Sequence, residues 1–182
     1  LTLAFGSGGT KYSSAHYNSS TKTLALAKNA GAGSLAHEYF HAFDNFISQH
    51  FLKRASRNNF ASSLWLQRHE VIEHPLNNLL ELCYQHIFLK ENSDTPSDIF
   101  LKSVEADKTL GIFYYAMPEE VAARAFEAFI QDQTLKNEFL VKGTKQSTEA
   151  KLGIYPFGRE REVINHHFSN YFRFLGKAVE RA

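Results

Sequence analysis

Apolar and polar positions follow two different periods along the chain, which divide it into a short β region and a longer helical region. Up to residue 30 the apolar residues come in short runs, Leu1–Phe5, Tyr12–Tyr17 and Thr23–Lys28. A polar triplet, Asn18-Ser19-Ser20, separates the last two runs, which is typical of a β-hairpin. We therefore predict a small antiparallel sheet in residues 1–30. Its last strand could offer a free edge to an extended peptide, or the sheet could simply cover a helical core.

From Ser34 onward the apolar residues recur every three to four positions, which predicts helices. The first helix runs from Ser34, a residue type that caps helix N-termini well, to about Lys53. Further helical segments follow at 61–92 with a break at Pro75, from 95 to about 106, from 118 to about 133, and at 158–181. The predicted fold class is α+β, mostly α. We expect one domain, 1–182, with a sheet in 1–30 and helices in 34–182.

Composition and charge limit the kinds of molecule that this protein is expected to bind. The 182 residues carry a net charge of +1 with no block of like charges, which argues against a nucleic-acid-binding surface. No apolar run reaches the length of a membrane span, and no signal peptide is visible. The single cysteine, Cys83, excludes an internal disulfide and fits a reducing cytoplasm. We expect a cytoplasmic protein without nucleic-acid or membrane partners, and an upstream segment before Leu1. The sequence does not indicate an oligomeric state.

One stretch of the first helix carries recognisable chemistry. Residues 33–44 read GSLAHEYFHAFD and contain the pattern H-E-x-x-H. His37 and His41 lie four residues apart, so they share one helix face and can hold one ion, usually Zn²⁺. Glu38 is placed to take a proton from a water beside that ion. The alternative is a helix that carries two ordinary, half-buried histidines, and a third ligand would decide against it.

The third ligand has three possible sources in the sequence. A third histidine would be needed at position 47, which is Ile47. Asp44 lies about 10 Å along the helix axis from His37, at roughly 1.5 Å per residue, too far to share an ion. It is better interpreted as a supporting carboxylate, for example to His41, or as an exposed acid. The remaining source is the helix after Pro118, where spacing alone leaves three acids open: Glu119, Glu120 and Glu127.

A resemblance to known families chooses among these acids. GAGSLAHEYFHAFDN, at 31–45, and PEEVAARAFEAF, at 118–129, resemble the metallopeptidase-like domain of large polyvalent proteins of phages and mobile elements, and related standalone bacterial proteins. They are also similar to the catalytic domain of anthrax lethal-factor-type proteases. The resemblance implies a zincin-like domain of bacterial or phage origin and a zinc metallopeptidase of the gluzincin type. Its third ligand begins an E-x-x-A-x-A-F segment, which only Glu120 fits.

The same resemblance implies roles for the neighbours of Glu120. Glu119 becomes a solvent-facing acid, and Glu127 a supporting or surface residue. Position 124 departs from the pattern, because Arg124 stands where lethal-factor-type proteases carry an acid. We expect the resemblance to extend to YPFGRER, at 155–161.

Those proteases place a tyrosine just upstream of the ligand helix, where it can stabilise the oxyanion. Here Tyr115 is the predicted residue, with Tyr114 as the neighbouring alternative. Rival donors are Tyr155, His166 and His167, and core packing is the alternative for each aromatic residue. The implied substrate is a protein or peptide. The competing function is a catalytically weak or inactive zinc-binding module of a mobile-element protein.

Overall fold

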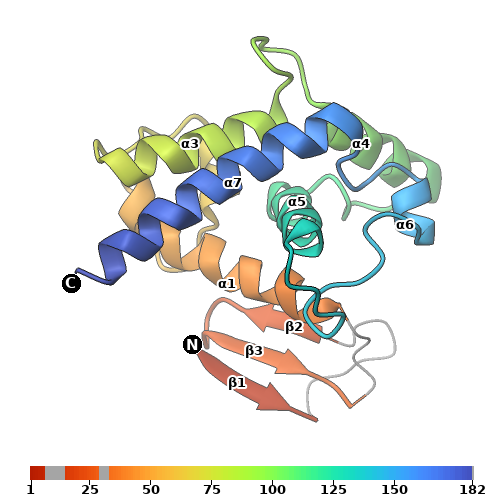
Figure 1. Cartoon of the computed structure of the whole chain (residues 1–182), viewed down its shortest axis with the longest axis horizontal. Helices are drawn as coiled ribbons and strands as arrows, with labels where there is room; N and C mark the ends of the chain where they lie inside the picture. Colours follow the sequence, from red (N-terminus) through yellow and green to blue (C-terminus); the bar gives the residue numbers. More distant parts are fainter. Residues whose placement is uncertain (7–14, 29–32, 182) are drawn as a thin grey trace.

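The computed structural model describes residues 1–6, 15–28 and 33–181. Within these ranges the chain is mostly helical with a small N-terminal sheet, which confirms the predicted fold class (Figure 1). None of the described helices combines the length and the apolar character that crossing a bilayer requires. The elements in chain order are β1 (Thr2–Phe5), β2 (Ala15–Asn18), β3 (Thr23–Leu26), α1 (Ser34–Phe51), α2 (Ala61–Leu66), α3 (Pro75–Phe88), α4 (Asp98–Leu110), α5 (Pro118–Asp132), α6 (Thr148–Lys151) and α7 (Gly158–Val179).

The sheet contains the predicted hairpin, but it is mixed rather than antiparallel. β2 and β3 pair antiparallel, with Ala15 opposite Leu26. β1 pairs parallel to β3 on the other side, so the strand order is β1-β3-β2. A run of four apolar residues predicts a strand but does not encode its direction, which is why the sequence missed the parallel pair. The predicted free edge at 23–28 is also wrong, because β3 is the central strand. The edge strand nearest the helices is β2, and the predicted positions 12–14 lie outside the described residues.

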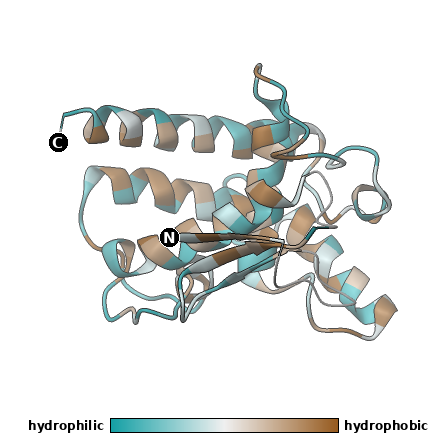
Figure 2. Cartoon of the chain, turned by 90° about the horizontal axis from the view of Figure 1, so that it is seen from below, coloured by the Kyte–Doolittle hydropathy of each residue, from teal (hydrophilic) through white to brown (hydrophobic). Residues whose placement is uncertain are grey.

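The helices surround a core rich in phenylalanine. In Figure 1, α1 lies above the sheet, α5 lies against α1, and α7 runs alongside α3 and across α5. The Phe126 ring of α5 lies 4.9 Å from Phe40 of α1 and 5.8 Å from Phe168 of α7, measured between ring centroids. In Figure 2, α7 alternates between hydrophobic and hydrophilic residues, as an amphipathic helix does. This core, with the buried alanines of α5, brings the first turn of α5 close to α1.

The start of α1 differs from the prediction in its cap. Ser34 is the first helical residue, and the N-cap is Gly33 with φ of 109°. A Cβ at this position would lie 2.7 Å from the backbone nitrogen of Lys142, so glycine is required by both the conformation and the close contact. Later in the chain, Pro75 does mark a break, because it is the first residue of α3 after a connector that follows α2.

Two histidines meet where α3 and α7 pack together. The rings of His86 and His167 stack with centroids 4.3 Å apart. Burial and the neighbouring charges of His86 and His166 lower the pKa of His167 to about 4. Burial also lowers the pKa of His86, against the opposing effect of Glu91. The folded state therefore resists protonation at this contact more than the unfolded chain does.

We predict that this contact makes the protein less stable in acid. Below the ordinary histidine pKa of about 6.5, His167 binds a proton in the unfolded chain. In the folded chain it does so only near its lowered pKa of about 4, so the unfolded state binds more protons between these two values. Stability should therefore fall as pH drops from 6.5 to 4, by about 1 kcal/mol once solvent screening of this partly exposed ring is allowed for. Urea unfolding of His167→Gln at pH 7.5 and 4.5 should show a smaller loss than the parent. His50→Gln, an exposed histidine of α1 that is not among the groups that shift the pKa of His167, is the control. Equal losses in the parent and His167→Gln would contradict the prediction.

Candidate metal centre

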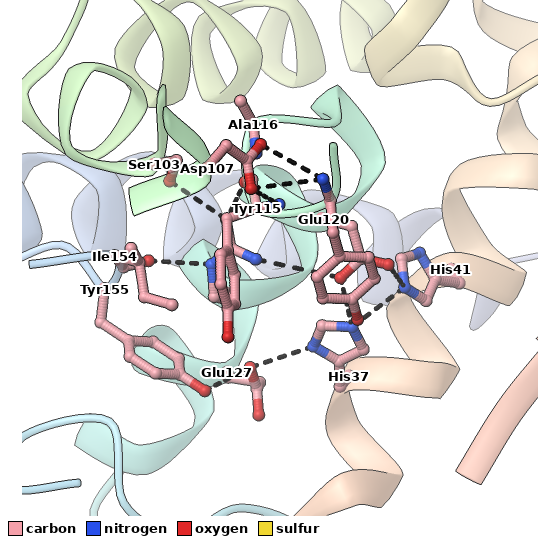
Figure 3. Close-up of polar contacts among 12 residues, drawn as sticks. His37, His41, Ser103, Asp107, Tyr115, Ala116, Glu120, Glu127, Ile154 and Tyr155 are labelled. Carbon is pink, nitrogen blue, oxygen red and sulfur yellow. Dashed lines mark hydrogen bonds and ion pairs between the residues drawn. The ribbon is translucent and has the colours of Figure 1, made fainter. Parts of the chain in front are cut away.

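Helices α1 and α5 bring three ligand atoms together (Figure 3). Nε2 of His37 lies 3.0 Å from Nε2 of His41 and 3.1 Å from Oε2 of Glu120. Nε2 of His41 lies 3.3 Å from Oε1 of Glu120. Ligand atoms at the corners of a zinc tetrahedron with bonds of about 2.0–2.1 Å are about 3.3 Å apart. This spacing means that His37, His41 and Glu120 could hold a metal ion.

The chemistry of the donor set fits such an ion. Two imidazole nitrogens and a carboxylate oxygen face one another, and their lone pairs would repel unless a proton or a cation lay between them. Two imidazoles and one carboxylate are a common donor set for catalytic zinc. All three side chains are buried or half-buried, so little water competes for their lone pairs. Zinc therefore suits these residues, which the sequence motif and the E-x-x-A-x-A-F segment indicate separately.

The charges within and around the triad shift the pKa values of its side chains. Burial lowers the pKa of His37, but the carboxylates of Glu127 and Glu120 outweigh burial and raise it to about 10. Burial raises the pKa of Glu120, but hydrogen bonds with His37 and His41 hold it well below the usual range. A metal ion must therefore displace a proton from His37 on binding.

Glu38 lies beside the triad and contacts the sheet. Its carboxyl group is largely buried, and burial raises its pKa against the opposing charges of His37 and His41. The backbone N–H of Tyr17 in β2 donates a hydrogen bond to this carboxyl group. A raised pKa makes a carboxylate a stronger proton acceptor. The sequence placed Glu38 but missed Tyr17, because a backbone donor leaves no signature in residue type.

Glu127 supports the first histidine. Its Oε2 lies 3.1 Å from Nδ1 of His37 and accepts a hydrogen bond of 3.1 Å from the Tyr155 hydroxyl. Among the described residues, Nδ1 of His41 has no such partner. Carboxylates that bind the second nitrogen of a ligating histidine fix its orientation and increase its basicity. Of the two roles expected for Glu127, the structure shows the supporting one.

We predict that Glu127→Gln weakens zinc binding by about 10–100-fold, the usual effect of losing such a carboxylate. The amide can no longer stabilise a positive His37 ring or hold its Nδ1 proton as firmly. Zinc affinity measured against a competing chelator would show the loss. Glu149→Gln is a matched control, because Glu149 is an exposed acid that lines the same cleft. Equal zinc affinity in the two variants would rule out this role for Glu127.

Two other predicted acids have different partners from those expected. Asp44 is fully buried, and its carboxylate accepts hydrogen bonds from the Ser62 N–H and hydroxyl and from the Tyr84 hydroxyl. It ties α1 to α2 and α3, so its predicted link to His41 is wrong. Glu119 is half-buried and accepts a 2.7 Å hydrogen bond from Ser63, so it is only partly exposed to solvent. In both cases α2 supplies the partner, and the sequence contains no local pattern for that packing.

The predicted oxyanion donors are spread over different places. Tyr114 and Tyr115 both line the cleft at the triad. Tyr114 forms a hydrogen bond with Glu120, and burial together with the Glu120 charge raises the pKa of its hydroxyl, which therefore keeps its proton. The ring of Tyr115 lies 5.5 Å from the Arg124 guanidinium carbon. Tyr155 also lines the cleft, bound to Glu127, whereas His166 and His167 are not among the described residues that line it.

A polar cleft of about 390 Å³ gives access to the triad. Its lining includes Ala15 of β2, His37 and Glu38 of α1, and Glu120 and Arg124 of α5. A larger hollow, of about 660 Å³, is lined by residues of the α2–α3 region such as Trp65 and Glu81. It contains none of the three ligand residues. The smaller cleft is therefore the candidate site for a substrate.

Comparison with known families bears on the second half of the chain. Residues 106–179 match the model of large polyvalent protein-associated domain 1, LPD1. This match supports the predicted relation to large polyvalent proteins. The LPD1 match contains Glu120, Glu127 and Tyr155, while α1 with its two histidines lies before it. No curated protein and no solved structure matches the chain significantly.

Proposed function

We propose that this chain is a zinc metallopeptidase of the gluzincin type that hydrolyses a protein or peptide in the cytoplasm. The observation that carries the proposal is the convergence of His37, His41 and Glu120 within 3.0–3.3 Å, with Glu38 beside them in a polar cleft. The LPD1 match supports the relation to large polyvalent proteins, and the resemblance to their metallopeptidase-like domain is the source of the peptidase hypothesis.

The residues of the site divide the work of peptide hydrolysis. Zinc, when bound by His37, His41 and Glu120, would polarise the substrate carbonyl and make a water molecule more acidic. Glu38 accepts the proton of the water that attacks the carbonyl carbon. When the carbon–nitrogen bond breaks, Glu38 passes this proton to the leaving amine. Its largely buried position and its raised pKa suit both steps.

A tyrosine hydroxyl would stabilise the negative charge that develops on the carbonyl oxygen. We place Tyr114 in this role, because it lines the cleft together with His37 and Glu120 and its hydroxyl forms a hydrogen bond with Glu120. Tyr115 stays the sequence-based prediction for the same role. Replacing each tyrosine by phenylalanine compares them directly, because only the loss of the hydroxyl that contacts the substrate should lower kcat.

Metal content and cleavage together test the proposal. The purified chain should contain about one zinc per molecule and should cleave members of a peptide library. A chelator should stop cleavage, and added zinc should restore it. Zinc well below one per chain after mild purification would overturn the metal site. Zinc at one per chain without any cleavage would favour the competing zinc-binding module and overturn the peptidase.

A further inference from the structure

The turn that carries Tyr114 is held by an unusual carboxylate. Residues 111–117 connect α4 to α5 without regular structure, yet three successive backbone N–H groups bind one side chain (Figure 3). The N–H groups of Tyr114, Tyr115 and Ala116 donate to Asp107 at 3.2, 2.8 and 2.9 Å. Asp107 lies in the last turn of α4, where the helix dipole disfavours a negative charge. We attribute this position to its role as the hydrogen-bond acceptor for the backbone N–H groups of the turn.

Arg124 holds the same turn from the other side. The residue is only 3% exposed, and Nη2 donates to the carbonyl oxygen of Tyr115. The same nitrogen donates to the Ser103 hydroxyl of α4 at 3.1 Å, and Nε donates to the carbonyl oxygen of Ile154 at 2.9 Å. One buried guanidinium thus joins α5 to α4, to the turn and to the segment that carries Tyr155.

Arg124 also faces the ligand. Its Nη1 lies 3.9 Å from Oε2 of Glu120, one helical turn away on α5. The site holds three largely buried carboxylates, Glu120 within the triad and Glu38 and Glu127 beside it. A divalent ion and one guanidinium together balance three negative charges. Arg124 is therefore compatible with a metal site here, although lethal-factor-type proteases carry an acid at this position. In this chain Glu127 provides the carboxylate that binds His37.

We propose that Asp107 and Arg124 form a clamp that fixes the 111–117 turn and so positions the Tyr114 hydroxyl beside Glu120. Burying two charged groups to order a short turn costs free energy that a solvated loop would avoid. This cost is expected at sites where a catalytic group must be held within a fraction of an ångström of its productive geometry. Both are positioning residues, and the kinetic part of their test rests on the proposed peptidase function.

Hydrogen exchange tests the clamp without any activity. Asp107→Asn keeps the side-chain shape but removes the charge and one acceptor oxygen. Exchange of the Tyr114, Tyr115 and Ala116 amides should rise at least about tenfold. Glu105→Gln, on the exposed side of α4, is the matched control and should change nothing in the turn. Unchanged exchange in Asp107→Asn would overturn the clamp, whether or not the chain is a peptidase.

A double-mutant cycle with Tyr114→Phe tests what the clamp is for. Asp107→Asn should lower kcat by about 10–100-fold, as supporting residues do, with KM and zinc affinity nearly unchanged. In the Tyr114→Phe background it should lower kcat by no more than about twofold, because the hydroxyl it positions is already absent. Arg124→Lys gives a second variant should Asp107→Asn fold poorly. Multiplicative losses would overturn the positioning role, and a parent chain without cleavage would overturn only the proposed function.

Discussion

Replacing Glu120 with alanine should weaken zinc binding by well over 100-fold and leave the chain folded. Loss of a carboxylate that merely supports a ligand already weakens metal sites by about 10–100-fold. Glu120 contributes more, because its two oxygens lie 3.1 Å and 3.3 Å from the two histidine nitrogens. Alanine at this position removes a ligand atom and the only one of the three that brings negative charge. The fold should survive, because α5 is anchored by its buried apolar face.

Zinc affinity measured with a competing chelator checks this prediction, and circular dichroism checks the fold. Glu119→Ala is the matched control, because both acids lie in the first turn of α5 and both interact favourably with the helix dipole. Glu119 binds Ser63 instead of the histidines, so its loss should leave zinc affinity unchanged. Strong loss in Glu119→Ala with none in Glu120→Ala would show that the wrong acid has been assigned.

The parts of the site that the sequence predicted are those encoded by local spacing. His37, Glu38 and His41 follow from one turn of helix, and the long amphipathic segments of α1, α5 and α7 follow from their periodicity. The choice of Glu120 was different. Spacing left three acids open, and only the resemblance separated them, because the contact between α5 and α1 joins residues about 80 positions apart.

The parts that the sequence missed depend on packing between distant segments. The partners of Asp44 lie in α2 and α3, and nothing near Asp44 in the chain indicates them. The direction of β1 depends on which side of β3 it joins, which a short apolar run does not specify. Asp107 binds backbone N–H groups of an irregular turn, and Arg124 binds the backbone carbonyl groups of Tyr115 and Ile154. Such backbone groups are present at almost every residue.

Glu38→Gln separates catalysis from metal binding, and it should lower kcat by about 10²–10⁴-fold, the range expected for loss of a general base. The glutamine amide has nearly the same size, and its oxygen can still accept the hydrogen bond from the Tyr17 N–H. It cannot take the proton of the attacking water or return it to the leaving amine. The triad ligands stay in place, so zinc affinity should change by only a few-fold.

The same peptide that the parent cleaves fastest should be used for this comparison, with zinc content measured on each sample. Glu149→Gln removes an exposed carboxylate from the cleft lining and should keep parent kcat, which controls for the loss of one negative charge. A Glu38→Gln chain that binds zinc and still cleaves at the parent rate would assign the proton transfer to another group. A chain that has lost zinc as well would show that Glu38 shapes the metal site itself. The combination of full zinc and lost turnover is the result that only a general base at position 38 explains.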